Sequence, residues 1–511
     1  MTSTIEKLTS GHAVAAGVGW NLLGRGAPIL VALAMTPVLI GQLGLDRWGL
    51  FTLGLALTGM ASIFDLGIGA ALTRALAERI GQGREAEAPQ LIVAAATIVA
   101  AVSLPTAVAL WFALPLLVDG VLPISPALQN EAVVGLRLLA LAVPAIVASS
   151  TLWGVMAAYQ SLRAGNLVSI PLVAFSYIGP ALVLLVWHSI IPVMLALTLT
   201  RWATAVSFGV LVLRLVPGLR RWPGLQAGEF FPLLRTGSWS TVGTVVASLL
   251  VFGDRFVVGA MGSLAAVSYY ATPLDLVLRF SILPVAVSTS LVPALATTLG
   301  PAPEQASALM LRSAALLYAV AVPTATVLVA FTPELLTIWL GADFATMAGD
   351  VLRLLAVGMA ISCMTTIPSS LLGAAGRFDL GAKLLLLQAV VTIPASVLLI
   401  QHFGPKGAAA AYVLRQAANF VAQTTAAARL YPGIFHFMPR LFALVSLVSA
   451  ALLLSMELSG VPARSLATVI MLTLLLPGVA ILLGREDWAS LRLDLGRRMI
   501  GLRPKWAGSA E

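Results

Sequence analysis

Long apolar runs that recur from one end of the chain to the other limit most strongly what this sequence can fold into. Residues 91–118, 167–187 and 466–483 each approach or exceed the roughly 20 apolar residues that carry a helix across a hydrocarbon core. Only 10% of the 511 residues are charged, and the mean hydropathy is +0.99. Soluble domains carry about 25% charged residues. The sequence therefore predicts an all-α, polytopic membrane protein.

The boundaries between apolar runs predict about 14 transmembrane helices. We place them near residues 13–41, 48–77, 91–118, 133–159, 167–188, 192–216, 234–262, 266–298, 307–332, 349–375, 381–402, 408–430, 440–458 and 465–483. The first run is too long for the apolar region of a signal peptide and lacks a convincing cleavage site. We expect it to remain as the first span.

Basic residues in the connections predict the orientation, because Lys and Arg in short loops stay on the cytoplasmic side. With the N-terminus inside, the cytoplasmic connections hold most of the loop Lys and Arg. The opposite loops hold only Arg47, Lys406 and Arg464. Both termini are therefore predicted to face the cytoplasm.

A hydrophilic connection after the sixth helix divides the predicted spans into two groups. Residues 217–229 combine Pro, Gly and Arg, as linkers do. Trp48 and Tyr269 occupy weakly matching positions in the first loop of each group, which indicates a parallel repeat of a six-helix unit. We predict a six-helix lobe at 1–216, a cytoplasmic linker at 217–233, a second six-helix lobe at 234–430, two extra transmembrane helices at 431–483, and a cytoplasmic, amphipathic, basic tail at 484–511.

Several kinds of chemistry are disfavoured by the composition. The single cysteine, Cys363, and four scattered histidines predict no disulfide framework and no metal site. The sequence has no phosphate-binding loop of an ATPase and no common hydrolase motif, so we expect no cofactor. The net charge is +9, yet no separate basic domain suits nucleic acid. Membrane topology and an anionic substrate explain the charge better.

Charged residues inside the predicted spans are the best functional leads, because a charge at mid-bilayer costs about 2.5–3.5 kcal/mol on insertion scales unless it is paired or hydrated. They are Arg25, Asp65, Arg74, Arg137, Arg201, Asp254, Arg255, Asp275, Arg279, Arg353 and Arg415. Arginines outnumber aspartates, so pairing cannot absorb all the positive charge. Arginine also matches phosphate oxygens through its planar fork. We infer a water-filled cavity for a phosphate-bearing ligand.

Position within each span separates candidates from anchors. Arg74, Arg137, Arg353 and Arg415 lie near span ends, where a structural role is favoured. Near mid-span, the candidates for substrate contact are Arg25, Arg201 and Arg279, against the alternative of buried structural pairs.

Each of the remaining charged residues within the predicted spans allows two interpretations. Asp275 and Arg279 can bridge each other across one helical turn. Asp254 and Arg255 can form a structural or gating pair. Asp65 can be a titrating ion-coupling carboxylate, and the glycines that follow it favour close helix packing. Prolines such as Pro37 predict kinks that suit alternating access, although static spans also contain proline.

Two pairs of segments resemble one known family. Residues 44–50 (GLDRWGL) and 64–74 (FDLGIGAALTR) resemble the first helical pair of the Wzx-type polysaccharide flippases. Residues 254–259 (DRFVVG) and 267–273 (VSYYATP) resemble the matching region of the second lobe. That family belongs to the MOP superfamily, with the MATE drug exporters and the peptidoglycan-precursor flippases.

The resemblance implies a non-enzymatic transporter of the bacterial cytoplasmic (inner) membrane. It implies alternating-access translocation of an undecaprenyl-diphosphate-linked oligosaccharide for O-antigen, capsule or exopolysaccharide synthesis, with polysaccharide polymerase machinery as a candidate partner. In this mechanism Arg25, Arg279 and Arg255 bind the diphosphate, and the lipid tail stays in the bilayer.

Four alternatives stay open. A MATE-like exporter of cationic drugs predicts acidic cavity residues, which are scarce here. A flippase for another lipid-linked precursor fits the same charges. A membrane glycosyltransferase or ligase needs catalytic groups on substantial loops, and these loops are short. A scaffold leaves the mid-membrane arginines unexplained.

Overall fold

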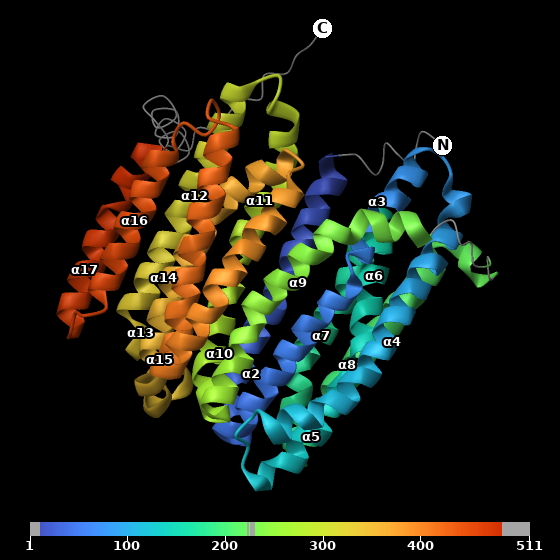
Figure 1. The fold of residues 1–511 in the computed structure, drawn as a ribbon, viewed down its shortest axis with the longest axis horizontal. Helices are drawn as coiled ribbons and strands as arrows, with labels where there is room; N and C mark the ends of the chain where they lie inside the picture. The colour runs from blue at the N-terminus through green and yellow to red at the C-terminus, as the bar shows by residue number, and fades with distance from the viewer. Residues whose placement is uncertain (1–10, 222–223, 225–229, 483–511) are drawn as a thin grey trace. The chain divides into compact units, whose positions relative to one another are not determined.

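The described part of the chain is helical throughout. The computed structural model describes residues 11–221, 224 and 230–482, and within them every regular element is a helix (Figure 1). The α-helices are α2 (Gly11–Met60), α3 (Ile68–Gly81), α4 (Ala88–Gly120), α5 (Pro126–Ala140), α6 (Val143–Ala158), α7 (Leu162–Leu184), α8 (Ile190–Leu215), α9 (Phe230–Met261), α10 (Leu264–Arg279), α11 (Ile282–Thr298), α12 (Pro303–Ala330), α13 (Thr332–Leu340), α14 (Ala342–Ala374), α15 (Phe378–Leu430), α16 (Met438–Ser455) and α17 (Val461–Thr473). Short 3-10 helices are η1 (Ala61–Asp65), η2 (Glu85–Glu87) and η3 (Pro217–Arg220).

Twelve helical segments of the described residues are long and apolar enough to cross a membrane. Two of them, Pro28–Asp65 and Asp379–Leu430, contain a kink where the sequence predicts a turn between two spans. The kinks lie at Gly44, with φ of 73°, and at Gly404, with φ of 56°. Glycine enters this left-handed region without steric cost. The prediction of a polytopic helical membrane protein with about 14 spans is confirmed.

Four predicted continuous helices are interrupted in the middle, and here the sequence prediction was wrong in detail. In the helix expected at 465–483, α17 ends at Thr473 and a turn at Leu474 precedes further helix. The helix expected at 133–159 is α5 and α6, and the one expected at 266–298 is α10 and α11. Pro144 and Pro284 stand just after these breaks, and each lacks the N–H for the preceding turn and crowds it sterically. In the helix expected at 48–77, Gly67 takes a left-handed φ of 68° between η1 and α3.

The chain divides into two compact units. Unit 1 comprises Met1–Ile282, Leu336–Val351 and Phe378–Tyr412. Within it α6 contacts both α4 and α8, and α2 contacts both α7 and α10 (Figure 1). A buried apolar cluster that includes Leu72, Leu76 and Ile92 joins α3, α4 and α6.

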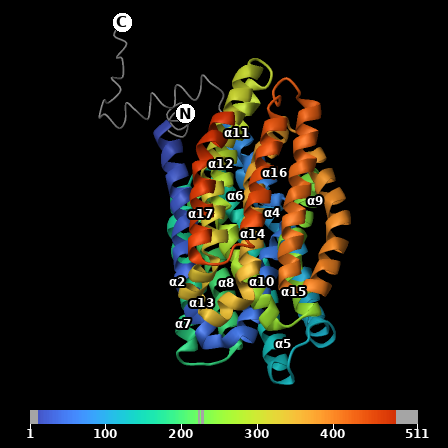
Figure 2. The ribbon, with the colours of Figure 1, turned by 90° about the vertical axis from the view of Figure 1, so that its left-hand side faces the viewer.

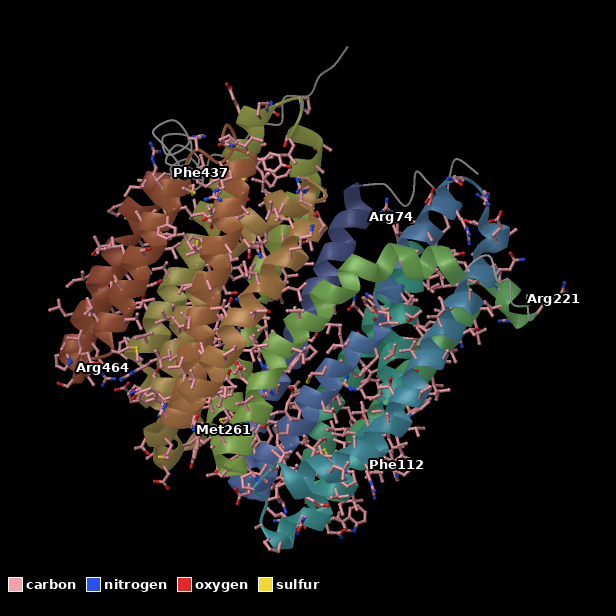
Figure 3. All side chains as sticks on the ribbon, viewed as in Figure 1. Arg74, Phe112, Arg221, Met261, Phe437 and Arg464 are labelled. Atoms are coloured by element: carbon pink, nitrogen blue, oxygen red, sulfur yellow. The ribbon has the colours of Figure 1, made fainter. Side chains whose placement is uncertain are left out.

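Unit 2 comprises Leu283–Leu335, Leu352–Arg377 and Val413–Glu511. In it α12 contacts α16 and α17 (Figure 2). Arg464, near the start of α17 (Figure 3), donates to both carboxylate oxygens of Glu334 at 2.7 and 3.0 Å and to the carbonyl of Ala330 at 2.9 Å. These hydrogen bonds lower the pKa of Glu334, which lies in the connection between two spans. The guanidinium thus caps the C-terminus of α12.

Large apolar side chains lie exposed along the spans, as lipid-facing residues of a membrane protein do. Phe112, Leu116 and Leu185 expose 68%, 73% and 68% of their surface. Soluble proteins rarely expose contiguous apolar area of this kind. The tail predicted at 484–511 lies outside the described residues, and the predicted lobe boundaries remain a prediction.

Candidate functional site

Two of the segments that carry the family resemblance pack directly against each other in unit 1. The helix after the Gly44 kink meets α10 so closely at Gly49 that an added Cβ atom would lie 1.9 Å from the carbonyl oxygen of Leu264. Ser268 donates to the carbonyl of Leu45 at 2.6 Å, and the indole N–H of Trp48 donates to Thr272 at 2.8 Å. These contacts fix the register of α10 along α2.

An ion pair between a buried guanidinium and a partly exposed carboxylate then ties α9 to α10. Arg255 is 1% exposed and donates to the two carboxylate oxygens of Asp275 at 2.5 and 3.4 Å. Its guanidinium also donates to the carbonyl of Thr52 at 3.4 Å. Arg255 therefore bridges three helical segments, and Asp275 offsets its charge.

The neighbouring carboxylate has a different contact. Asp254, which is 6% exposed, accepts a hydrogen bond from the hydroxyl of Tyr270 at 3.2 Å. Arg255 thus forms its ion pair with Asp275 of the next helix, whereas a structural or gating pair of Asp254 with Arg255 stays a prediction. Consecutive residues of a helix point in directions about 100° apart, so they do not face each other.

Arg279 ends α10 at the break in the middle of its span. Its guanidinium donates to the hydroxyl of Tyr177 on α7 at 3.0 Å and lies 5.7 Å from the centre of that ring. Among the described residues, no carboxylate pairs with Arg279, so the alternative of a bridge to Asp275 is wrong. A guanidinium has five N–H donors, and most of these stay available.

Arg279 lines a small polar cavity that lies wholly within unit 1. The lining residues come from α2, α7, α10 and α13 and are Leu33, Thr36, Trp48, Leu55, Tyr177, Thr272, Asp275, Leu276, Arg279 and Trp339. Hydroxyl, indole and carboxylate groups therefore surround the guanidinium at a depth where hydrocarbon would otherwise be expected.

Trp339 closes one wall of this cavity by satisfying a carbonyl that proline leaves free. Pro37 has no N–H to donate to the carbonyl of Leu33 one turn earlier. The indole N–H of Trp339 donates to that carbonyl at 2.8 Å. The turn of α2 that precedes Pro37 is therefore part of the wall of the site.

Arg201 and Arg25 are the other two residues predicted near mid-span to contact the substrate. Arg201 lies half-buried on α8 within electrostatic reach of Tyr177, the partner of Arg279. Across the described ranges, Arg201 has no hydrogen bond and no ion pair. Arg25 lies on α2, but its side chain is outside the part of the chain whose side chains the structure describes.

Asp65 lies at the break before α3 and holds that helix against α6. Its carboxylate accepts from the hydroxyl of Thr151 at 3.2 Å and from the backbone N–H of Gly69. The helices approach so closely that a Cβ on Gly154 would lie 2.6 Å from the carbonyl oxygen of Gly69. The glycines after Asp65 thus serve helix packing, while ion coupling by Asp65 stays a prediction.

Sequence reasoning missed the uncharged half of the site, namely Tyr177, Trp48, Thr272 and Trp339. A usable signal existed for one of them. The chain has only 7 tyrosines, and Tyr177 stands in the middle of an apolar run. A buried tyrosine hydroxyl needs a hydrogen-bond partner, which points to a polar neighbour.

Comparisons with known proteins agree on both family and fold. The sequence model of the family described as "Polysaccharide biosynthesis protein" matches residues 14–299. A Shigella flexneri protein provisionally named an O-antigen transporter is 23% identical over 411 residues, which are 78% of this chain and 93% of that protein.

Solved structures of the MOP superfamily share the fold. A multidrug resistance MATE transporter in its inward-facing conformation gives a TM-score of 0.64 at 15% identity, over 82% of this chain and 95% of that one. The lipid II flippase MurJ in an inward closed conformation gives 0.64 at 11% identity, over 90% and 98%. A MOP superfamily transporter from Pyrococcus furiosus gives 0.61 at 14% identity, over 84% and 96%.

Proposed function

The chain belongs to the polysaccharide biosynthesis protein family, and from this premise we propose that it is a flippase for a lipid-linked oligosaccharide. Its substrate is an undecaprenyl-diphosphate-linked repeat unit, which it moves across the cytoplasmic membrane by alternating access. Both termini face the cytoplasm. The name of the Shigella flexneri relative and the fold shared with a lipid II flippase support this proposal.

The observation that carries the proposal is the state of Arg279. This arginine lies at a helix break inside a membrane span, and among the described residues its one hydrogen bond goes to a neutral hydroxyl. An unpaired charge there is costly unless water or an opposite charge reaches it. A diphosphate supplies two adjacent anionic groups whose oxygens match the guanidinium fork. The cavity has a volume of about 10 Å³, room for about one water molecule, so we assign Arg279 to the diphosphate in a more open state of the transport cycle.

Arg201 supplies a second positive charge within electrostatic reach of Tyr177, outside the residues that line the cavity. It approaches Tyr177 from α8, and Arg279 approaches the same residue from α10. Two cations that share one neutral neighbour repel each other in a medium of low dielectric constant. A bridging anion with two phosphates removes that repulsion. We assign Arg201, and Arg25 on α2, to the same anionic group.

Arg255 and Asp275 have a positioning role in this scheme. Their charges offset each other, and the guanidinium of Arg255 is nearly inaccessible. They hold α10 at the angle that presents Arg279 to the cavity. Breaks in membrane helices are common where transporters bind charged ligands, and the break after Arg279 gives α10 and α11 separate freedom to move.

Accumulation of the lipid-linked repeat unit tests the proposal. In a strain that lacks the gene, we expect the unit to accumulate on the cytoplasmic leaflet of inner-membrane vesicles, and the wild-type gene to relieve this. Arg279→Ala removes a charge-assisted contact worth about 1.5–3 kcal/mol, so transport should fall roughly 10- to 100-fold. Arg279→Lys keeps the charge but loses the fork, and should recover only part of the rate.

Arg214→Ala is the matched control, because Arg214 is exposed at the end of α8, away from the cavity. It should behave as wild type. Unchanged glycan in the deletion strain, together with altered drug resistance, would reject the proposal and favour a MATE-like exporter.

A further inference from the structure

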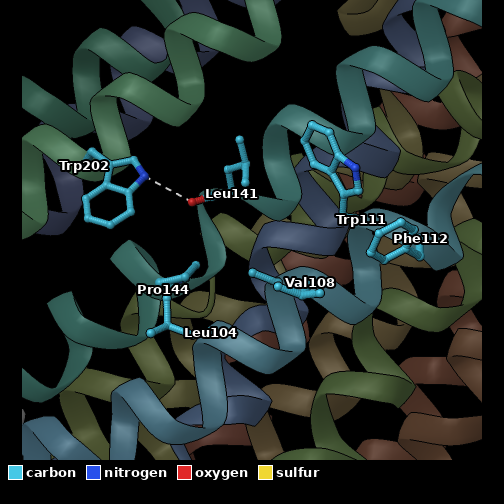
Figure 4. Close-up of a pocket in the computed structure, with 8 residues that line it drawn as sticks. Leu104, Val108, Trp111, Phe112, Leu141, Pro144 and Trp202 are labelled. Carbon is cyan, nitrogen blue, oxygen red and sulfur yellow. Dashed lines mark hydrogen bonds between the residues drawn. The ribbon is translucent and has the colours of Figure 1, made fainter.

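An apolar groove runs along α4 on unit 1, apart from the polar cavity. Two adjoining cavities form it, and both are lined by Leu104, Pro144 and Trp202. The first continues to Trp111 and Phe112, and its lining is shown in Figure 4. The second continues along α4 in the opposite direction to Ile92. The groove thus lies between α4, the break that separates α5 from α6, and α8.

The lining of the groove is mostly apolar. All of its side chains are uncharged. The indole N–H of Trp202 is already bonded to the carbonyl of Leu141 at 3.0 Å (Figure 4), and the hydroxyl of Thr151 is bonded to Asp65 at 3.2 Å. The hydroxyl of Ser103 and the indole N–H of Trp111 are the other polar groups of the lining. The rest of the surface is hydrocarbon, so the groove suits a hydrocarbon chain.

The length of the groove distinguishes between hydrocarbon chains. From Ile92 to Phe112 the α4 helix rises about 30 Å at 1.5 Å per residue, which equals the full thickness of a bilayer core. A chain confined to one leaflet covers about half of that. The groove also faces outward, since Leu104, Val108 and Phe112 are 54%, 58% and 68% exposed. It therefore fits a lipid chain that is long enough to extend into both leaflets.

One end of the groove carries a cation. Arg137 lies 5.3 Å from the ring centre of Trp111 and donates from Nε to its carbonyl at 3.1 Å. Pro115 leaves that carbonyl without its helical donor. In the part of the chain that the structure describes, the terminal nitrogens of Arg137 have no further partner. A phosphate at this end complements the charge.

We propose that this groove binds the polyisoprenoid chain of the translocated lipid, with its phosphate at Arg137. The inference rests on the proposed function. With the N-terminus in the cytoplasm, α4 ends toward the outer leaflet, so Arg137 and the bound phosphate lie on that side. The groove therefore receives the lipid after the lipid leaves the polar cavity.

Photocrosslinking tests the groove. The probe is a polyprenyl phosphate with a diazirine on its chain, added to the full-length protein in phosphatidylglycerol nanodiscs. Label should map to residues 88–118 and 198–206. Unlabelled polyprenyl phosphate should compete at least about tenfold better than added phosphatidylglycerol, because only the long chain fills the groove. Equal competition by the two lipids would mean a site for ordinary membrane lipid and would overturn the proposal.

Neighbouring alanines provide matched variants. Ala100 and Ala101 are both exposed on α4, but only Ala100 lines the groove. Ala100→Trp places an indole ring in the groove and should reduce labelling about fivefold or more, because the ring occupies space that the chain needs. Ala101→Trp should leave labelling unchanged, and equal effects of the two would overturn the proposal. Arg137→Gln should weaken competition by polyprenyl phosphate roughly tenfold, but not competition by uncharged polyprenol.

Transport by the same preparations separates this proposal from the proposed function. Flipping of the lipid-linked glycan without groove labelling would overturn the groove and leave the function standing. Groove labelling without any flipping would overturn the inference that the polyisoprenoid chain in the groove belongs to a transported lipid.

Discussion

Removing the carboxylate that pairs with Arg255 should destabilise the protein strongly. Asp275→Asn keeps the size of the side chain but leaves the guanidinium without a counter-charge, on a residue that is 1% exposed. Breaking a buried ion pair from one side costs about 3–5 kcal/mol. The side chain of Asp275 is 31% exposed, so water screens part of the charge, and the amide oxygen of Asn still accepts one hydrogen bond. We therefore expect a loss of about 2 kcal/mol.

The double variant Arg255→Met/Asp275→Leu tests whether stability requires these two charges or only requires that neither charge is left without its partner. Replacing both partners by apolar residues removes the desolvation cost together with the attraction, and should bring stability to within about 1–2 kcal/mol of wild type. Equilibrium unfolding in mixed micelles measures both variants, with the exposed Asp46→Asn as a neutral control. A loss of less than about 1 kcal/mol for Asp275→Asn, or a double variant as unstable as the single, would refute this reasoning.

Three further predictions concern packing and pH. Gly49→Ala should cost about 3 kcal/mol or more, because its new methyl group meets a backbone oxygen at 1.9 Å, whereas Gly41→Ala, with open space around it, should be neutral in the same unfolding assay. Trp339→Phe should cost about 1–3 kcal/mol in wild type but clearly less in a Pro37→Ala background, where the helix supplies its own N–H; equal costs in the two backgrounds would contradict the capping role. Because the folded-state pKa of Glu334 lies below its unfolded value, its ion pair stabilises the protein above about pH 4.3 and is lost as pH falls through the folded pKa. The Glu334→Gln variant should therefore be less stable than wild type at pH 7 and equally stable in acid. Thermal scans of both proteins across that pH range can check this.

The sequence was sufficient for the fold because bilayer physics leaves few options. Apolar length alone locates the spans, and glycine positions such as Gly44 and Gly404 locate the turns. The family resemblance drawn from a few segments of helices 1, 2, 7 and 8 is confirmed by the family match over residues 14–299. The mid-span breaks were less visible, because proline is also common within continuous membrane helices.

The candidate site was only partly predictable. A charge inside an apolar run stands out, so Arg279 and Asp275 were found from the sequence. Their partners were not, because Arg255 and Tyr177 reach them from other helices, and one sequence does not tell which helix faces which. Local spacing allowed a bridge between Asp275 and Arg279 as one of two interpretations, but Arg255 on α9 pairs with the carboxylate instead.

In the proposed mechanism the protein moves a lipid-linked diphosphate across the bilayer, and Arg279 of the polar cavity binds the diphosphate. Proteoliposomes that contain a fluorescent undecaprenyl-diphosphate-linked oligosaccharide measure this directly, by loss of the label accessible to an impermeant quencher. We expect wild-type protein and Arg214→Ala to move the lipid between leaflets, and Arg279→Ala to be slower by roughly 10- to 100-fold. Wild-type protein no faster than empty liposomes, or Arg279→Ala as fast as wild type, would contradict the account.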